Sequence, residues 1–386
     1  MIIALPCFAV ENAPELGSQA AVLLDAATGT VLFEKNADEE IPPASLTKLV
    51  TMHIALKEAA AGRASLDEIV PLPPESWAIR QPPRSSLMFL AAGQRVSLGE
   101  LLLGLAVPSG NDAAVAVALR FAPTVEGFVQ AMNAEAEGMG LQKTRFTEPS
   151  GISEFNMTTA RDFAQFCREY IGLHPETLKD YHTVEEFAYP KAENVAAVFR
   201  SRPGTIIQYN RNALLKSFPG TDGLKTGYID EAGYNIALTA ERQGTRFIVV
   251  ILGGPAARGG DRIRDDDGKR LLTWAFENYK TIRPVIDPPE PARIWKGKTN
   301  FTDIVPAGAL EFTAEINRGA GLRGEVALDY PLLAPLPSGT TVGSLVLYDD
   351  RGELRRIPLE TIQAVERGGF FKRIWDSIRL FFRSLG

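Results

Sequence analysis

Residues 43–51 read PASLTKLVT, and they place the hydroxyl of Ser45 three positions before the amine of Lys48, at the start of an apolar segment. Side chains three residues apart lie on one face of a helix, so the amine can reach the serine oxygen and take its proton. The amino terminus of a helix also favours negative charge. Because an SxxK pattern arises by chance in a chain of this length, the hypothesis of a serine nucleophile needs support from other segments.

The composition excludes several classes of function. The chain has 386 residues, 45% hydrophobic and 23% charged, which suits a large core and two or three domains. Its formal charge of −6 argues against general nucleic-acid binding. The three histidines have no spacing typical of metal ligands, and no glycine-rich phosphate loop is present. We therefore expect no metal site, no cofactor and no Ser-His-Asp triad.

The first residues are similar to an export signal. Residues 1–10, MIIALPCFAV, are uncharged and mostly apolar, and Ala9 and Ala13 are small residues suited to cleavage. We interpret residues 1–16 as the remnant of such a signal, with a buried first strand as the alternative. Cys167 lies on the apolar side of a helical pattern, which predicts a buried core cysteine. No segment reaches the roughly eighteen apolar residues of a membrane-spanning helix.

The order of predicted elements indicates one mixed α+β domain over residues 17–285. A hairpin is predicted at 19–36 and a helix at 46–62, and helical patterns continue to about residue 180. Within this helical part, Ser97 and Glu100 form the pattern of a capping box. Strand patterns follow residue 200, so we expect a sheet built from the first and last elements. These later strands read DGLKTGYI, YNIALTAER and TRFIVVILGG.

A second domain is predicted after a proline-rich break, IRPVIDPPEPAR. From residue 292 to 365 the pattern is strand and turn throughout, with turn signals every eight to twelve residues. This spacing is typical of a small β-sandwich. Nothing in it resembles a catalytic motif.

The tail, residues 366–386, predicts an amphipathic helix. Basic residues lie off its apolar stripe, although the protein as a whole is acidic. Large aromatic side chains with a basic flank suit a helix lying in a membrane interface. The alternative is a terminal helix packed on its own domain. The stripe consists of Phe371, Ile374, Trp375, Ile378, Phe381, Phe382 and Leu385.

Two further motifs follow the SxxK segment. SGN, with Ser109 and Asn111, lies at a break between apolar helical segments, where a polar side chain either caps a helix or lines a cleft. KTG begins with Lys225 and ends with Gly227, on a predicted strand. Glycine lets another backbone approach closely, and the lysine adds positive charge beside it.

In this order and these settings, the three motifs resemble those of the penicillin-interacting serine acyltransferases. Finer similarities indicate the serine D-Ala-D-Ala carboxypeptidases among the low-molecular-mass penicillin-binding proteins. The resemblance implies a β-lactamase/transpeptidase-like fold, an antiparallel sheet with helices on both sides, followed by a β-domain and an amphipathic tail. The segments that carry it are PASLTKLVT, SSLMFL, PSGNDAAVAVA, NRNALL and DGLKTGYIDEAGYN.

The resemblance assigns a role to each motif. Ser45 would attack the carbonyl between two terminal D-alanines, and water would cleave the resulting ester. Lys48 would act as the base, with burial and the charge of Lys225 lowering its pKa. Ser109 would relay a proton to the leaving nitrogen, while Asn111 would hold the base and the substrate amide.

The same resemblance implies how substrate is held. The backbone N–H groups of Ser45 and Tyr228 would form the oxyanion hole. An extended peptide would lie antiparallel to the KTG strand, at Gly227. Thr226 and Arg211 would bind its free carboxylate; Arg211 also has a simpler interpretation as a surface arginine in a turn.

Two positions depart from the family pattern. Ile229 stands where KTG-x-T has a hydroxyl, which loosens selectivity for a free C-terminus. FTEPSGI replaces FxNPxGL and places Glu148 thirty-seven residues after Asn111, close to the spacing of the deacylating glutamate in class A β-lactamases. We interpret this as coincidence, because no ExxxN loop accompanies it.

The resemblance thus implies a periplasmic carboxypeptidase that trims peptidoglycan pentapeptide stems and is inhibited covalently by β-lactams. Its tail would attach it to the outer face of the bacterial inner membrane. The enzyme alternatives are a D,D-endopeptidase and a β-lactamase on the same scaffold. The non-enzyme alternative is a wall-binding scaffold protein, against which the intact motif residues argue.

Overall fold

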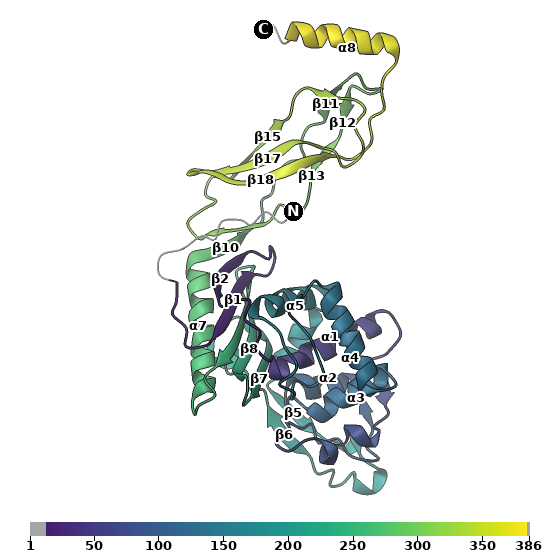
Figure 1. Cartoon of the computed structure of the whole chain (residues 1–386), viewed down its shortest axis with the longest axis vertical. Helices are drawn as coiled ribbons and strands as arrows, with labels where there is room; N and C mark the ends of the chain where they lie inside the picture. The colour runs from purple at the N-terminus through teal and green to yellow at the C-terminus, as the bar shows by residue number, and fades with distance from the viewer. Residues whose placement is uncertain (1–12, 384–386) are drawn as a thin grey trace. The chain divides into compact units, whose positions relative to one another are not determined.

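A computed structural model describes residues 13–383, so most of the predicted export signal lies outside the described residues. The chain divides into two compact units between Glu277 and Asn278. Each unit has its own apolar core (Figure 1).

The first unit is built on a five-stranded sheet. Every pair of neighbouring strands is antiparallel. The strand order is β2-β1-β9-β8-β7, so the first and last elements of the unit share one sheet, as predicted. The strands are β1 (Ala20–Asp25), β2 (Val31–Lys35), β7 (Thr221–Ile229), β8 (Gly233–Arg242) and β9 (Thr245–Gly254).

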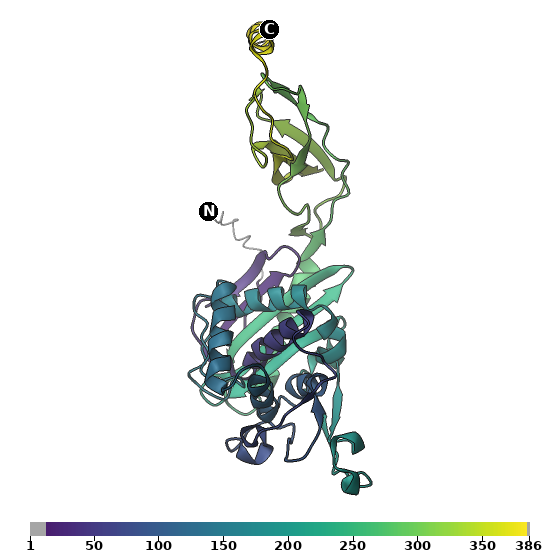
Figure 2. The ribbon, with the colours of Figure 1, turned by 90° about the vertical axis from the view of Figure 1, so that its right-hand side faces the viewer.

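Helices cover both faces of this sheet, because its central strands are apolar on both sides. Helix α5 (Ala160–Leu173) packs on β1 and β9, and its Cys167 is buried, as predicted. Helix α7 (Gly260–Asn278) covers the other face, where Phe276 meets Phe247 edge-on at 4.9 Å between ring centroids. Figures 1 and 2 show the sheet between these helices. The resulting layers confirm the predicted transpeptidase-like arrangement.

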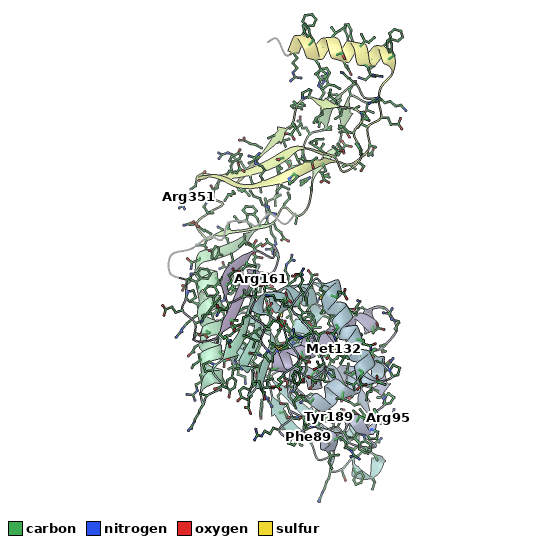
Figure 3. The ribbon with its side chains drawn as sticks, viewed as in Figure 1. Phe89, Arg95, Met132, Arg161, Tyr189 and Arg351 are labelled. Carbon is green, nitrogen blue, oxygen red and sulfur yellow. The ribbon has the colours of Figure 1, made fainter. Side chains whose placement is uncertain are left out.

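Charged side chains tie the edges of the sheet to its helices. Arg161, in the first turn of α5, lies 3.0 Å from Glu34 on β2 and 2.9 Å from Asp38 beyond it (Figure 3). On the opposite face, Asp267 of α7 accepts hydrogen bonds from the backbone N–H of Ser18 at 2.8 Å and from its hydroxyl at 2.7 Å. These contacts therefore hold the start of β1 and the end of β2 in place.

Helices α2 (Leu98–Ala106), α3 (Asn111–Phe121) and α4 (Val125–Gly138) pack on α1 (Thr47–Ala60), whose residues from Thr47 to Leu56 are all buried. A helix enclosed on every side carries its polar side chains into the interior, and this explains why Lys48 lies inside the protein. The predicted capping box of Ser97 and Glu100 is present at the start of α2. The other elements are α6 (Leu214–Ser217), β3 (Ile69–Val70), β4 (Val96–Ser97), β5 (Glu186–Tyr189) and β6 (Ile206–Tyr209).

The second unit is the predicted small β-domain. Its three- and four-stranded sheets share one apolar core that includes Ile294 and Leu347. Strand β10 (Tyr279–Ile282) pairs with β14 (Phe312–Glu315), so the unit begins before the proline-rich break, at residue 278 and not after residue 285. The other strands are β11 (Ala292–Trp295), β12 (Phe301–Thr302), β13 (Ile304–Pro306), β15 (Arg323–Leu328), β16 (Leu332–Leu333), β17 (Thr341–Asp349) and β18 (Gly352–Thr361).

The chain ends in the predicted amphipathic helix, α8 (Phe370–Arg383). Within residues 13–383, no helix has both the length and the apolar content needed to cross a bilayer.

The three histidines of the chain form a buried cluster with Tyr170 of α5. His53 Nδ1 lies 3.0 Å from His174 Nε2, and the hydroxyl of Tyr170 lies 2.9 Å from His182 Nε2. Burial lowers the pKa of His174 to about 4, helped by the nearby His53. Burial likewise lowers the pKa of His182 to about 3 and depresses that of His53. The folded protein therefore keeps these rings neutral.

This cluster predicts loss of stability in mild acid. The folded-state pKa of His174 lies below the unfolded value, so its contribution is complete above about pH 6.5 and is lost as the pH falls toward 4. Between pH 7.5 and pH 5, the free energy of unfolding should fall by about 2 kcal/mol less in His174→Gln than in wild type. Urea denaturation at both pH values measures this, with the exposed Lys179→Gln as control. Equal pH dependence in His174→Gln and wild type would contradict the prediction.

Candidate active site

Ser45 and Lys48 lie together where a short 3₁₀ turn, Ala44–Leu46, leads into α1. Lys48 is fully buried, and its amine donates hydrogen bonds to Ser45 Oγ at 3.1 Å, Asn111 Oδ1 at 2.8 Å and the carbonyl of Ser150 at 2.5 Å. These three oxygens hold the amine beside the serine hydroxyl. The arrangement is that of a serine nucleophile with a lysine base.

The KTG strand packs directly against the nucleophile. A Cβ on Gly227 would lie 2.9 Å from the carbonyl of Pro43 and 3.0 Å from the backbone nitrogen of Ser45, so only glycine permits this approach. Strand β7 is the last strand of its sheet, and within residues 13–383 no strand pairs with its outer edge. An exposed strand edge is the kind of surface to which an extended peptide can add. Tyr228 follows at this edge, and its own side chain turns outward to donate to Asp230 at 2.7 Å.

The SGN segment joins α2 to α3 beside Lys48, as predicted. Asn111 accepts from Lys48 through Oδ1 and donates through Nδ2 to Ser85 Oγ at 3.1 Å. Ser109 has a left-handed backbone, with φ of +64°, and its buried hydroxyl has no hydrogen-bond partner among the described residues. A buried hydroxyl without a partner is available for a reacting group, and here it is not bonded to either lysine.

Lys225 and Thr226 are both buried on β7. The amine of Lys225 donates to the carbonyl of Thr226 at 3.0 Å. Arg211 approaches from the segment after β6 and donates to Ser86 Oγ at 3.0 Å. Arg211 is exposed, as the interpretation as a surface arginine in a turn expects, and its charge also acts on both site lysines. Its role in binding substrate stays a prediction.

The electrostatics of the site favour a neutral Lys48. Burial lowers its pKa to about 7, and the positive charge of Arg211 acts in the same direction, while Glu148 and Asp112 oppose it. Burial also lowers the pKa of Lys225 well below its ordinary value, reinforced by the charge of Lys48. A base whose pKa lies near neutrality has the protonation state that general-base catalysis needs.

Several residues of the site were missed by sequence reasoning. The buried carboxylate of Asp112 accepts from the backbone N–H groups of Met88 at 2.8 Å and Leu90 at 2.9 Å. It thereby fixes the segment SSLMFL, which supplies the partners of Asn111 and Arg211. The only available signal was the family-like sequence of this segment and of PSGNDAAVAVA, because no local pattern shows that the two segments meet.

Comparison with known proteins gives matches over nearly the whole chain. The family model described as D-alanyl-D-alanine carboxypeptidase matches residues 8–256. A second model, described as the C-terminal domain of penicillin-binding protein 5, matches residues 279–367. The first model matches most of the first compact unit, without α7, and the second matches most of the second unit.

Individual proteins agree with these matches. D-alanyl-D-alanine carboxypeptidase DacC of Escherichia coli K12 is 34% identical and covers 99% of this chain and 93% of its own length. The crystal structure of penicillin-binding protein 5 from Haemophilus influenzae superposes with a TM-score of 0.80 at 29% identity, covering 92% of this chain and 99% of its own. Penicillin-binding protein D2 of Listeria monocytogenes in its cefotaxime-bound form has a TM-score of 0.57 at 28% identity, covering 68% and 98%.

The pKa of Lys48 predicts a pH-dependent acylation rate. Because only the neutral amine accepts a proton, the second-order rate constant should rise about eightfold between pH 5.5 and 6.5 and level off above about pH 8. Labelling with a fluorescent penicillin at each pH measures this constant. A flat profile from about pH 6 to 9 would contradict the lysine-base mechanism.

Proposed function

This chain belongs to the serine D-alanyl-D-alanine carboxypeptidase family, and we propose that it removes the terminal D-alanine from peptidoglycan pentapeptide stems through an ester on Ser45. The observation that carries the proposal is the hydrogen bond of 3.1 Å between the buried amine of Lys48 and Ser45 Oγ. It supplies the base that a serine hydroxyl needs to attack an amide.

Acylation follows from this geometry. Neutral Lys48 takes the proton of Ser45 while Oγ forms a bond to the carbonyl carbon between the two D-alanines. The backbone N–H groups of Ser45 and Tyr228 stabilise the developing oxyanion. When the C–N bond breaks, Ser109 passes a proton from the Lys48 ammonium to the leaving nitrogen, and its buried, unpartnered hydroxyl supports this role. D-alanine leaves and Lys48 is neutral again.

Deacylation reverses the direction of proton transfer. Lys48 takes a proton from a water molecule, which attacks the ester carbonyl, and Ser45 Oγ leaves and recovers the proton. Asn111 holds the amine throughout, since its Oδ1 accepts from Lys48 Nζ at 2.8 Å. Lys225, buried on β7, lies on the strand along which the substrate peptide would bind. β-Lactams acylate the same serine and act as covalent inhibitors, which the antibiotic-bound structural relative supports.

Recognition of a free C-terminus depends on Arg211 and Thr226. Arg211 lies close enough to bias both lysines, and Thr226 is buried next to Lys225. A carboxylate placed between them would gain charge-assisted hydrogen bonds. Ile229 removes one hydroxyl from this region, which favours D,D-endopeptidase activity as the second candidate function.

We predict that wild type releases D-alanine from a D-Ala-D-Ala peptide and that Ser45→Ala does not. Loss of the nucleophile should lower the rate at least about a thousandfold. Chromatographic detection of free D-alanine measures this. Equal release by the two proteins would support a non-catalytic wall-binding scaffold and contradict the proposal.

Two controls separate the enzyme alternatives. A C-terminally amidated peptide should be cleaved slowly, and cleavage at the rate of the free acid would indicate an endopeptidase. A β-lactamase would lose its penicillin label within seconds, whereas a carboxypeptidase should keep it for minutes.

The location of the enzyme follows from its substrate and from α8. Peptidoglycan stems lie outside the inner membrane, so we place the enzyme in the periplasm. The apolar side chains of α8 from Phe371 to Phe382 are 43 to 84% exposed along the predicted stripe, apart from the partly buried Leu380. A helix with an exposed aromatic face and a basic flank binds in the plane of a membrane interface. We propose that α8 attaches the enzyme to the outer face of that membrane.

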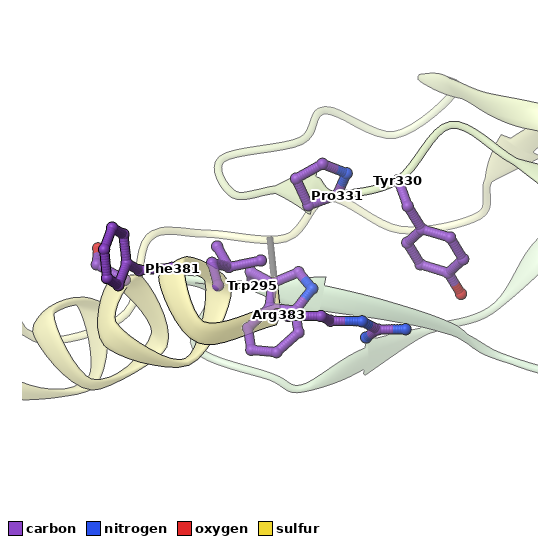
Figure 4. Close-up of a pocket in the computed structure, with 7 residues that line it drawn as sticks. Trp295, Tyr330, Pro331, Phe381 and Arg383 are labelled. Atoms are coloured by element: carbon purple, nitrogen blue, oxygen red, sulfur yellow. The ribbon is translucent and has the colours of Figure 1, made fainter. Parts of the chain in front are cut away.

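Polar contacts join α8 to the β-domain. The buried Asp376 accepts from the backbone N–H of Lys296 at 2.7 Å, and Lys372 donates to Asn300 Oδ1 at 2.6 Å. Beside the last turns, a cavity of about 540 Å³ lies between Arg383 and Trp295 (Figure 4). The helix is thus incompletely packed on its own domain, which supports a second surface as its apolar partner.

We predict that a chain ending at Gly369 leaves the membrane fraction and keeps D-alanine release within about twofold. This end point keeps Val365 and the hydrogen bond of 2.8 Å from Gly368 N to the carbonyl of Lys296. Sedimentation with phospholipid vesicles measures attachment. A full-length control with Phe371→Glu and Trp375→Glu should also stay in solution. Continued association of the shortened chain would favour a helix packed only on its domain.

A further inference from the structure

Glu148 departs from the family pattern, and its carboxylate organises the loop beneath the nucleophile. Oε2 accepts from the backbone N–H of Ser150 at 2.7 Å and from the hydroxyl of Ser150 at 2.6 Å. Oε1 accepts from the backbone N–H of Gly151 at 2.6 Å and from Asn156 Nδ2 at 2.9 Å. Both oxygens are therefore saturated by groups of the same loop.

The residues fixed by Glu148 are those that contact the reacting pair. The carbonyl of Ser150 accepts from Lys48 Nζ at 2.5 Å, and the preceding carbonyl, of Pro149, accepts from Thr51 Oγ1 at 2.7 Å. Gly151 lies against the backbone before Ser45, where an added Cβ would be 1.8 Å from the carbonyl of Ala44. Three consecutive loop residues thus contact the start of α1.

This arrangement excludes the role that class A β-lactamases give to a glutamate at a similar spacing. A deacylating base must hold a water molecule through a free carboxylate oxygen. Each oxygen of Glu148 already accepts two hydrogen bonds from its own loop. The interpretation of the spacing as coincidence therefore agrees with the geometry.

Glu148 also contributes charge to the site. Among the groups that act on Lys48, Glu148 and Asp112 favour the protonated amine, while Arg211 and burial disfavour it. Burial lowers the pKa of Lys225 on β7, and the charge of Lys48 lowers it further. Asp112 is committed to the N–H groups of the neighbouring loop. Glu148 is therefore the negative charge attached to the loop that Lys48 itself contacts.

We propose that Glu148 is a positioning residue for the base: it holds Ser150 and Gly151 against Lys48 and Ser45, and its charge balances the ammonium that forms when Lys48 takes the proton of Ser45. The proposal rests on the proposed function, in which Lys48 is that base. Glu148 itself touches no reacting atom. Its negative charge, acting against burial, raises the pH at which Lys48 becomes neutral and able to accept the proton.

The test compares Glu148→Gln and Glu148→Asn with wild type. Glutamine keeps the length and removes the charge, and asparagine is the residue that the family pattern FxNPxGL has at this position. The second-order rate constant of labelling by a fluorescent penicillin is measured from about pH 5.5 to 9.5. Glu154→Gln is the matched control, because Glu154 is exposed in the same loop.

In both Glu148 variants the midpoint of the acidic limb should move down by about one pH unit, because a favourable charge for the ammonium is lost. The plateau at high pH should fall about tenfold as the loop loosens. Glu154→Gln should match wild type in both. An unmoved midpoint in folded Glu148→Asn would overturn the proposal, whatever happens to the plateau. If the proposed function itself failed, wild type would show no Ser45-dependent labelling, so the two failures are distinguishable.

Discussion

The burial of one amine is the constraint on which the catalytic unit depends. Lys48 lies on a helix that is enclosed on all sides, and it is surrounded by Ser45, Asn111 and the carbonyl of Ser150. An ammonium group in such a setting costs several kcal/mol of desolvation, which is why the pKa of Lys48 falls to about 7. The same burial that makes the amine a base also requires three separate segments to supply its hydrogen-bond partners.

Two carboxylates, the buried Asp112 and the half-buried Glu148, hold the segments that contact Lys48 and its partner Asn111. Asp112 accepts from the N–H groups of one loop, and Glu148 accepts from those of another. The hydrogen bonds to each carboxylate hold the backbone of a loop that lines the site. Gly227 and Gly151 then allow the KTG strand and the second loop to approach the backbone at Ser45. The KTG strand and the second loop are therefore held beside Ser45 by close contacts between backbone segments. The charged side chains of Asp112 and Glu148 fix the loops.

Much of this could be predicted from the sequence, because several signals are local. The apolar runs of β8 and β9, the capping box at Ser97 and the stripe of α8 each follow from residues close together in the chain. The contacts of Ser150 and Asp112 could not be predicted in the same way. They join segments that are far apart in the chain, and hydrogen bonds to backbone groups leave no pattern in residue types. The start of the second unit at β10 was missed for the same reason, since its partner β14 follows the proline-rich break.

The sequence by itself determined the chemistry of the site: a hydroxyl and an amine one helical turn apart, followed by SGN and KTG in the order of a known family. It also determined the departures at Ile229 and Glu148. Only the tertiary structure decided that the amine is enclosed, that the charge of Arg211 acts on it, and that both oxygens of Glu148 are occupied by its own loop. The physical reason is that residue types and helical spacing are local properties, whereas burial, and the pKa that follows from it, depend on what the rest of the chain packs around each group.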